Sequence, residues 1–328
     1  MKIEFEKLNE NHFNEIIAMI NSDFKIQATK CPELLEINDD AKLRNLLNFI
    51  STQNYSKVVL IQNKVAGFVA FLNAWDGFFG NAKGTFSPFG TSAFLQKNDF
   101  GIAREKIISM TISEMMADMV KDGITSFALS HFESDAYFMK TLVLLGFGIR
   151  CSDAIAFTKD VIEKTDSVPL KDVCPENISF RELPKDEKNL VRDLRLKLAG
   201  HLASSPIFFP TNMETYDQWF KNDDIRVFAA FNEEKIVGFI SISSEGETYF
   251  SENDSMTNIC GTYFDPSLRG TGIPQKLLNY VCKTVQDEGK KIIGVDYETL
   301  NPTALNFWTK YFKPYTYSFA RRIDERIL

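Results

Sequence analysis

The sequence predicts a mixed α/β (α+β) protein built from two similar domains in tandem. Its 328 residues suffice for two domains of about 150 residues each. Three short motifs recur at one separation of 171 residues, which indicates an internal duplication. In each half, short apolar strand segments alternate with segments of helical periodicity, an order typical of sheets covered by helices.

Composition and charge narrow the class of protein. Hydrophobic residues make up 44% of the chain and charged residues 25%, which is ordinary for a globular protein. The formal net charge of −7 disfavours binding to a nucleic-acid backbone. No basic stretch followed by an apolar one opens the chain, and no apolar run reaches the roughly 20 residues of a membrane helix. We therefore expect a cytoplasmic protein that contacts neither nucleic acid nor membrane.

The cysteines and histidines are too dispersed to predict a metal site. No two cysteines form a C-x-x-C pair, and only three histidines accompany them. We expect free thiols in a reducing compartment and no bound metal. The five cysteines are Cys31, Cys151, Cys174, Cys260 and Cys282.

The duplication is visible in three pairs of dipeptides. They are Gly67-Phe68 with Gly238-Phe239, Gly90-Thr91 with Gly261-Thr262, and Gly101-Ile102 with Gly272-Ile273. Unrelated coincidences would not share one offset. The segment between Ala156 and Ile178 lacks periodicity and is rich in charged residues, as a linker would be. We predict an N-terminal domain over residues 1–160, a linker over 161–177 and a C-terminal domain over 178–328.

The elements follow the same order in both halves. Residues 58–61 and 65–69 are expected strands around a tight turn, and residues 227–231 and 236–240 repeat this pattern. In the second half a strand over residues 259–264 leads to a helix. The apolar face of that helix is formed by Ile273, Leu277, Leu278, Val281 and Val285.

Two more strands complete the second half. Residues 292–299 alternate, with Ile293, Val295 and Tyr297 on one face. A further strand near the C-terminus is marked by Tyr315, Tyr317 and Phe319.

The loop over residues 265–274 joins a strand to a helix and contains Gly270 and Gly272. Glycines let backbone N–H groups point at a ligand, and a helix N-terminus adds positive potential, which together favour a phosphate or pyrophosphate. The loop is not a Walker loop, because no Gly-Lys-Ser/Thr follows. It also lacks the third glycine of a dinucleotide fingerprint. On the glycine pair alone, a plain turn before a helix is the simpler interpretation.

The residues around the glycines carry a resemblance. The strand, the turn with Arg269, Gly270 and Gly272, and the amphipathic helix resemble the acyl-CoA loop of the GNAT superfamily of N-acetyltransferases, whose pattern is R/Q-x-x-G-x-G/A. Pro274 occupies the last place of that pattern. Residues 301–308 resemble the later helix of the family. The resemblance covers nearly the whole chain and implies two tandem GNAT-like domains, each a mixed, mostly antiparallel sheet flanked by helices.

The resemblance also implies an activity. An acetyl group would pass directly from acetyl-CoA, the co-substrate, to a primary amine, without a covalent enzyme intermediate. Backbone N–H groups at the end of the strand would polarise the thioester carbonyl, as in an oxyanion hole. The implied cofactor-binding residues are Tyr263, Phe264, Arg269, Gly270, Thr271, Gly272, Ile273, Asn301 and Trp308.

Candidates for the acid–base chemistry come from the last strands. Asp296 and Glu298 lie two residues apart on an expected strand and share a face, so either could take the proton of the amine. A solvated strand face is the alternative. Trp308 stands where the family usually has the tyrosine that protonates the thiolate. Three tyrosines are candidates to replace it, although each could be core: Tyr311, Tyr315 and Tyr317. We select Glu298, Asp296 and Tyr315 as the catalytic set.

The N-terminal copy departs from the family pattern. Its loop keeps Gly101 and the amide of Ala103, but Asn98 replaces the arginine and Asp99 brings a negative charge toward the phosphates. We therefore expect this copy to be degenerate. His131 is expected to be a hydrogen-bonded structural residue.

Alternatives to this reading stay open. The copies could be reversed, with the N-terminal loop active through Ala103. Trp308 and Pro274 motivate a non-catalytic acyl-CoA-binding or interaction module with the same fold. The acidic chain favours a small cationic amine as acceptor, with a peptide N-terminus also open, and the sequence carries no signal of oligomeric state.

Overall fold

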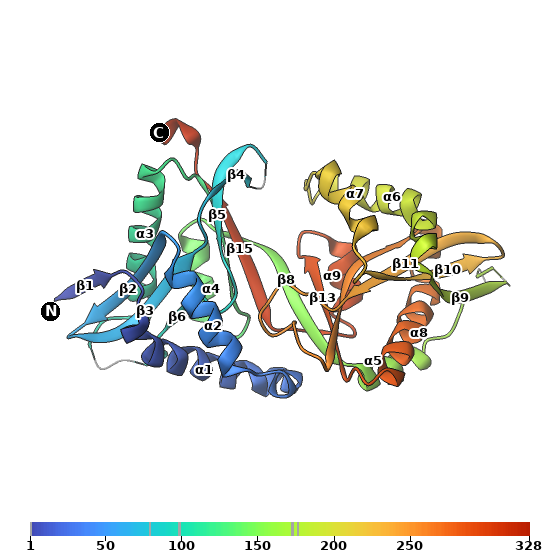
Figure 1. The fold of residues 1–328 in the computed structure, drawn as a ribbon, viewed down its shortest axis with the longest axis horizontal. Coiled ribbons are helices and arrows are strands. Elements are labelled where there is room, and N and C mark those ends of the chain that lie inside the picture. Colours follow the sequence, from blue (N-terminus) through green and yellow to red (C-terminus); the bar gives the residue numbers. More distant parts are fainter. Residues whose placement is uncertain (1, 79, 98–99, 172–173, 176) are drawn as a thin grey trace. The chain divides into compact units, whose positions relative to one another are not determined.

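The backbone contacts of the computed structural model divide the chain into two compact units (Figure 1). The structure describes residues 2–78, 80–97, 100–171, 174–175 and 177–328. Unit 1 comprises Met1–Ser152 and Pro314–Leu328, and unit 2 comprises Asp153–Lys313. No helix among the described residues is both long enough and apolar enough to cross a membrane.

Unit 1 contains strands in the orders β1-β2-β3-β6 and β4-β5-β7-β15-β8, with helices packed on them. Its strands are β1 (Ile3–Glu6), β2 (Tyr55–Ile61), β3 (Lys64–Phe71), β4 (Trp75–Phe78), β5 (Ala82–Ser87), β6 (Ser92–Phe94), β7 (Ser126–Phe132), the first part of β8 (Gly148–Phe157) and β15 (Thr316–Arg322). Its helices are α1 (Phe13–Lys30), α2 (Asp40–Ser51), α3 (Arg104–Lys121) and α4 (Ala136–Leu144).

Unit 2 contains strands in the order β8-β13-β12-β11-β10-β9. Its remaining strands are β9 (Ile178–Leu183), β10 (Arg226–Asn232), β11 (Lys235–Ser243), β12 (Met256–Phe264), β13 (Ile292–Glu298) and the short β14 (Lys313–Pro314). Its helices are α5 (Thr158–Asp166), α6 (Arg192–Ala203), α7 (Met213–Lys221), α8 (Ile273–Asp287) and α9 (Pro302–Trp308). Strands β9 to β12 pair antiparallel, whereas β12 and β13 pair parallel.

The sheet of unit 2 is covered on both faces because its strands alternate between two apolar sets. Phe228 of β10 and Ile240 of β11 pack in the cluster that contains α8 and α5. Val227 and Phe239 pack in the cluster that contains α6 and α7. Figure 1 shows these two helix pairs on either side of the strands. The apolar face predicted for α8 is buried in the first of these clusters.

The recurring Gly-Phe motif has the same structural cause in both units. Gly67 of β3 pairs with Phe94, and Gly238 of β11 pairs with Phe264. A Cβ atom on either glycine would lie only 2.2 or 2.1 Å from a ring atom of that phenylalanine. The aromatic ring therefore lies directly over the neighbouring backbone, and only glycine leaves room for it. The predicted duplication and the mixed α/β class are confirmed by the fold.

Two segments differ from their sequence-based description. The expected linker begins with helix α5, because Val161 and Thr165 lie one turn apart and are buried in unit 2. The predicted C-terminal strand exists as β15, but it pairs with β7 and β8 and so belongs to unit 1. The alternating pattern that predicts a strand carries no information about which sheet the strand joins.

A Gly238→Ala substitution tests the close approach of Phe264. We expect it to lower the free energy of unfolding by about 1–3 kcal/mol, because the new methyl group overlaps the ring. Gly200→Ala is the matched control: its Cβ meets nothing within 4 Å on α6, and it should be neutral or stabilise by up to about 1 kcal/mol. Urea unfolding of both variants gives the comparison, and equal stabilities would contradict the assignment.

Candidate functional site

The site of unit 2 opens where two neighbouring strands part. Strands β12 and β13 pair in parallel only as far as Ile259 and Val295, although they continue to Phe264 and Glu298. Over the same stretch β12 remains paired with β11 on its other side. A register shift leaves Cys260 without an opposite residue, which forms a β-bulge at the start of the parting. Two adjoining cavities lie in this opening.

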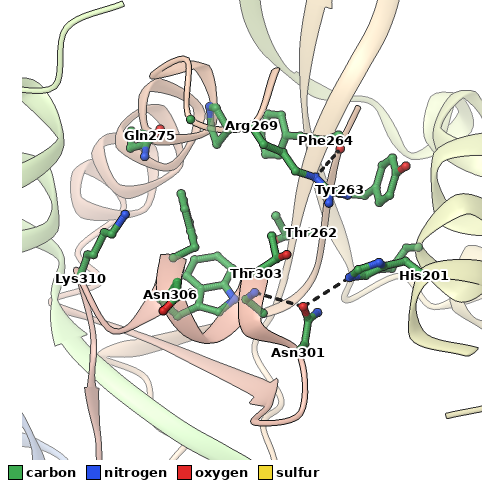
Figure 2. Close-up of a pocket in the computed structure, with 16 residues that line it drawn as sticks. His201, Thr262, Tyr263, Phe264, Arg269, Gln275, Asn301, Thr303, Asn306 and Lys310 are labelled. Atoms are coloured by element: carbon green, nitrogen blue, oxygen red, sulfur yellow. Dashed lines mark hydrogen bonds between the residues drawn. The ribbon is translucent and has the colours of Figure 1, made fainter. Parts of the chain in front are cut away.

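The first cavity has a volume of ≈ 290 Å³ and is lined by the end of β12, the glycine loop and α9 (Figure 2). Its basic lining groups are Arg269 from the loop, Lys310 from the segment after α9 and His201 from α6. No carboxylate is among the described residues that line it. The cavity is therefore suited to an anionic ligand.

The glycine loop presents backbone donors to this cavity. Gly270 and Gly272 have φ angles of 73° and 99°, in the left-handed region that favours glycine. Within the described part of the chain, the amides of Gly270 and Gln275 donate no hydrogen bond. Both residues line the cavity, and Gln275 lies in the first turn of α8. Free amides at a helix N-terminus form an anion-binding site.

Arg269 is held beside these donors. Its Nε atom donates to the carbonyl oxygen of Phe264 at 3.4 Å, and its guanidinium lies 5.6 Å from the ring centre of Tyr263. Arg269 forms no ion pair with any residue that the structure describes. Its positive charge thus remains available to a ligand.

His201 and Asn301 form a polar pair at one wall of the first cavity (Figure 2). The Nε2 atom of His201 lies 3.3 Å from Oδ1 of Asn301, and the same oxygen accepts the amide of Ala304 and caps α9. Sequence reasoning missed His201 as a site residue. The available signal is that Leu198 and His201 share a face of α6, three residues apart.

The second cavity, of ≈ 230 Å³, has a different character. It shares Thr262, Asn301 and Trp308 with the first cavity, so the two meet at the end of β12. Its charged lining residues among those described are Asp296 and Glu298 of β13. The two carboxylates expected to share a strand face thus both border one cavity.

The pKa of Asp296 is raised to about 8. The residue is exposed at the protein surface, and partial loss of hydration around its carboxyl group is the largest cause of the shift. The carboxylates of Glu247, Asp153 and Glu298 raise the pKa further. A carboxyl group with such a pKa can exchange a proton with an amine near neutral pH.

The structure brings most, but not all, of the expected cofactor residues to the cavity. Those that line it are Tyr263, Phe264, Arg269, Gly270, Asn301 and Trp308. Thr271 instead donates its hydroxyl to the carbonyl of Leu268. Ile273 lies in the apolar core, and Gly272 packs so closely that a Cβ would be 2.5 Å from the carbonyl oxygen of Pro169. These three residues do not line the first cavity and instead contribute to the structure of the loop.

The candidate tyrosines lie in different units. Tyr315 belongs to unit 1, where its ring lies 6.0 Å from that of Phe89, and it lines neither cavity of unit 2. Tyr317 also belongs to unit 1, and burial raises its pKa. Tyr311 lies in unit 2, and its ring centre is 5.5 Å from that of Phe307, a lining residue of the first cavity. Burial raises the pKa of Tyr311, while a hydrogen bond with Gln275 lowers it.

The corresponding region of unit 1 is occupied by an ion pair. Arg104, 171 residues before Gln275, extends its guanidinium to Asp135, with Nη1 to Oδ1 at 2.6 Å. Asp135 caps α4 as Asn301 caps α9. Arg104 also donates to the carbonyl oxygens of Phe94 and Leu95, at the end of β6.

His131 completes this buried cluster. Its Nε2 lies 3.1 Å from Asp135 and its Nδ1 3.1 Å from the hydroxyl of Ser92. The hydrogen bonds expected of His131 are present. Asn98 and Asp99, on which the expected loss of function partly rested, lie outside the described residues.

Comparison with known proteins agrees with the fold. The model of the acetyltransferase (GNAT) family matches residues 196–312. A GCN5-related N-acetyltransferase from Sphaerobacter thermophilus aligns over 98% of this chain and 95% of its own, with a TM-score of 0.56 and 13% identity. A tandem GNAT protein from the clavulanic acid biosynthesis pathway aligns over 98% of both chains, with a TM-score of 0.51 and 14% identity. No curated protein gives a significant sequence match.

The family match over residues 196–312 and the fold support a protein of the acetyltransferase type. At these identities the solved structures show the fold alone, and the family match covers the part of the chain that contains both cavities. Residues 196–312 match the GNAT acetyltransferase family, and the chain as a whole has the fold of two tandem GNAT-like domains.

The raised pKa of Asp296 predicts how stability depends on pH. Between its ordinary value of 3.8 and about 8, the folded protein keeps a proton that the unfolded chain releases. Stability from this group is therefore lost as the pH rises through that range. The Asp296→Asn variant does not titrate at this position. From pH 4 to pH 8, its free energy of unfolding should therefore rise relative to that of the natural protein. Urea unfolding across that range measures the difference, and a constant difference would contradict the shift.

Proposed function

We propose that unit 2 is an acyl-CoA-dependent N-acetyltransferase that transfers an acetyl group from acetyl-CoA to a primary amine. The observation that carries this proposal is the junction of two cavities of opposite charge at the parting of β12 and β13. A polyanionic acyl donor fits the first cavity, and an amine fits the second. The two substrates would meet beside Thr262, Asn301 and Trp308.

Acetyl-CoA binding would use the loop donors and the unpaired cations. The free amides of Gly270 and Gln275 are positioned to hold a diphosphate, with Arg269 adding charge. Pro274 offers no N–H, so the site has one donor fewer than the family pattern supplies. Lys310 at the rim of the same cavity adds a second positive charge.

Polarisation of the thioester would use the strand backbone. The amide of Asp265 donates to the carbonyl of Val237 on β11, at 3.1 Å. Because strand amides alternate in direction, those of Thr262 and Phe264 point away from β11, toward the opening. Negative charge that develops on the thioester oxygen would be stabilised there.

Asp296 is our candidate for the general base. The amine nitrogen would bond to the carbonyl carbon as the C–S bond breaks. The amine proton would pass to Asp296, directly or through water, and the electron pair would leave with the CoA thiolate. Trp308 has no hydroxyl to protonate that thiolate, so Tyr311 and His201 are the nearby candidates for the acid.

Unit 1 would serve as a degenerate structural partner. Its Arg104–Asp135 pair bridges the start of α3 and the start of α4, where unit 2 has its first cavity. Removing a buried arginine that pairs with a carboxylate costs several kcal/mol. A ligand would therefore have to displace a stabilising contact.

One observation favours a second candidate function. Trp308 contributes an indole, not a phenol, to both cavities. A non-catalytic acyl-CoA-binding module would need the first cavity and no acid. Binding of CoA without acetyl transfer would support that alternative.

Thiol release from acetyl-CoA with a panel of primary amines tests the enzyme. Arg269→Gln should weaken acetyl-CoA binding about tenfold or more, because a hydrogen-bonded charge is lost from the diphosphate site. Lys283→Gln is the control, since it removes a positive charge from α8 at an exposed ion pair with Asp166. If Arg269→Gln binds acetyl-CoA as tightly as this control, the loop assignment fails.

Calorimetric titration with acetyl-CoA tests whether one unit or both units bind this ligand. We expect one binding site per chain, because Arg104 holds the corresponding region of unit 1. Arg269→Gln should weaken that single site. Two sites of comparable affinity, or a site insensitive to Arg269→Gln, would favour the reversed assignment.

A further inference from the structure

The buried cluster of unit 1 contains three side chains with the chemistry of metal ligands. Asp23 of α1, His131 of β7 and Asp135 at the start of α4 each offer one ligand atom, and these atoms all lie within 4.8 Å of one another. The exposed fractions of the three residues are only 2%, 2% and 5%. Because the residues come from three separate elements, no spacing motif in the sequence marks them.

Asp23 is the member of this group that lacks a matched charge. Its Oδ1 atom accepts a hydrogen bond from the side-chain amide of Gln96, but its Oδ2 atom is buried and accepts none from any described residue. The guanidinium of Arg104 pairs with Asp135 instead. Burial raises the pKa of Asp23. A buried carboxyl group with a free oxygen therefore needs a proton or a cation at this position.

Asp135 has one position left for an ion. A carboxylate offers about four lone-pair positions on its two oxygens. Arg104 takes one position on each oxygen, and the amide of Phe138 takes the other on Oδ1. The remaining position, on Oδ2, faces Nε2 of His131 at 3.1 Å. Two ligand atoms of a tetrahedral zinc ion lie about 3.3 Å apart, so one ion can bind both atoms with little movement.

His131 is held in the orientation that a ligand needs. Its Nδ1 atom lies 3.1 Å from the hydroxyl of Ser92, and Nε2 is directed toward Asp135. Its ring also stacks on that of Phe138, with centroids 3.9 Å apart. Metal-binding histidines are usually oriented through their second ring nitrogen in this way.

A cavity of ≈ 540 Å³ lies beside the cluster. Gln96, which donates to Asp23, is one of its lining residues, and so are Met19 and Ser22 of α1. The cavity gives an ion a route to Asp23 past the side chain of Gln96, as a metal site requires.

We propose that Asp23, His131 and Asp135 bind a zinc ion and that a water molecule completes its coordination. One imidazole and two carboxylates suit zinc, whereas imidazole is a poor ligand for magnesium. The ion balances the charge of Asp23 and links α1 to β7 and α4, so it stabilises unit 1. This site is separate from the function proposed for unit 2, and neither depends on the other.

Calorimetric titration of the chelator-treated, full-length protein with Zn²⁺ tests the proposal. We expect one site that Asp23→Asn weakens at least tenfold, because a ligand charge is lost. Glu36→Gln removes an exposed carboxylate from the same unit and is the control, which should bind as the natural protein does. Equal binding by the natural protein and Asp23→Asn, no binding, or tighter binding of Mg²⁺ than of Zn²⁺ would overturn the proposal.

The absorption spectrum of bound Co²⁺ identifies the type of ligand. Nitrogen and oxygen ligands give weak visible bands, whereas thiolates add intense near-ultraviolet absorption. We expect the weak bands alone at the site that Asp23→Asn removes. Thiolate absorption at that site would assign the ion to the cysteines and overturn the proposal.

Urea unfolding with and without Zn²⁺ separates a metal ion from a proton at Asp23. Zinc should raise the unfolding midpoint of the natural protein and of Glu36→Gln, but not of Asp23→Asn. Ser92→Ala keeps all three ligands and loses only the hydroxyl at His131, so it should bind zinc about tenfold more weakly even if Asp23→Asn does not fold. A midpoint that zinc leaves unchanged, or unweakened zinc binding by Ser92→Ala, would contradict the assigned site.

Discussion

The separation of two parallel strands is the constraint on which the site depends. Strands β12 and β13 are hydrogen-bonded through Ile259 and Val295 and then diverge. A strand edge without a partner leaves backbone donors that a ligand can use, and the divergence creates the space for that ligand. The sheet needs β11 to hold the free part of β12 in place, and it needs Gly238 to let Phe264 lie over the neighbouring backbone.

The sequence was most informative where a short motif determines the local backbone structure. The common offset of Gly67 and Gly238 predicted the duplication, and Arg269 with its glycines drew attention to the loop that lines the first cavity. The same reasoning could not place His201 or Lys310, because they reach the cavity from separate elements far apart in the chain. Tyr315 was expected beside the site as a substitute for the tyrosine that Trp308 replaces, but strand alternation does not identify the neighbouring strand.

The two units show how one fold can keep or close the same opening. In unit 2 the start of α8 carries Gln275, whose neutral side chain leaves the cavity open. In unit 1 the corresponding Arg104 is long and charged, and Asp135 at the cap of α4 supplies its partner. Different residue types at two positions thus accompany an open cavity in unit 2 and a buried ion pair in unit 1.

The position of β15 has a consequence for biosynthesis. This strand lies between β7 and β8 in the sheet of unit 1, yet it is formed by the last part of the chain, after all of unit 2. A nascent chain on the ribosome therefore lacks the strand between β7 and β8 until residues 316–322 have been synthesised. Unit 2 has all its residues sooner, so the second half of the protein can reach its native state before the first half does.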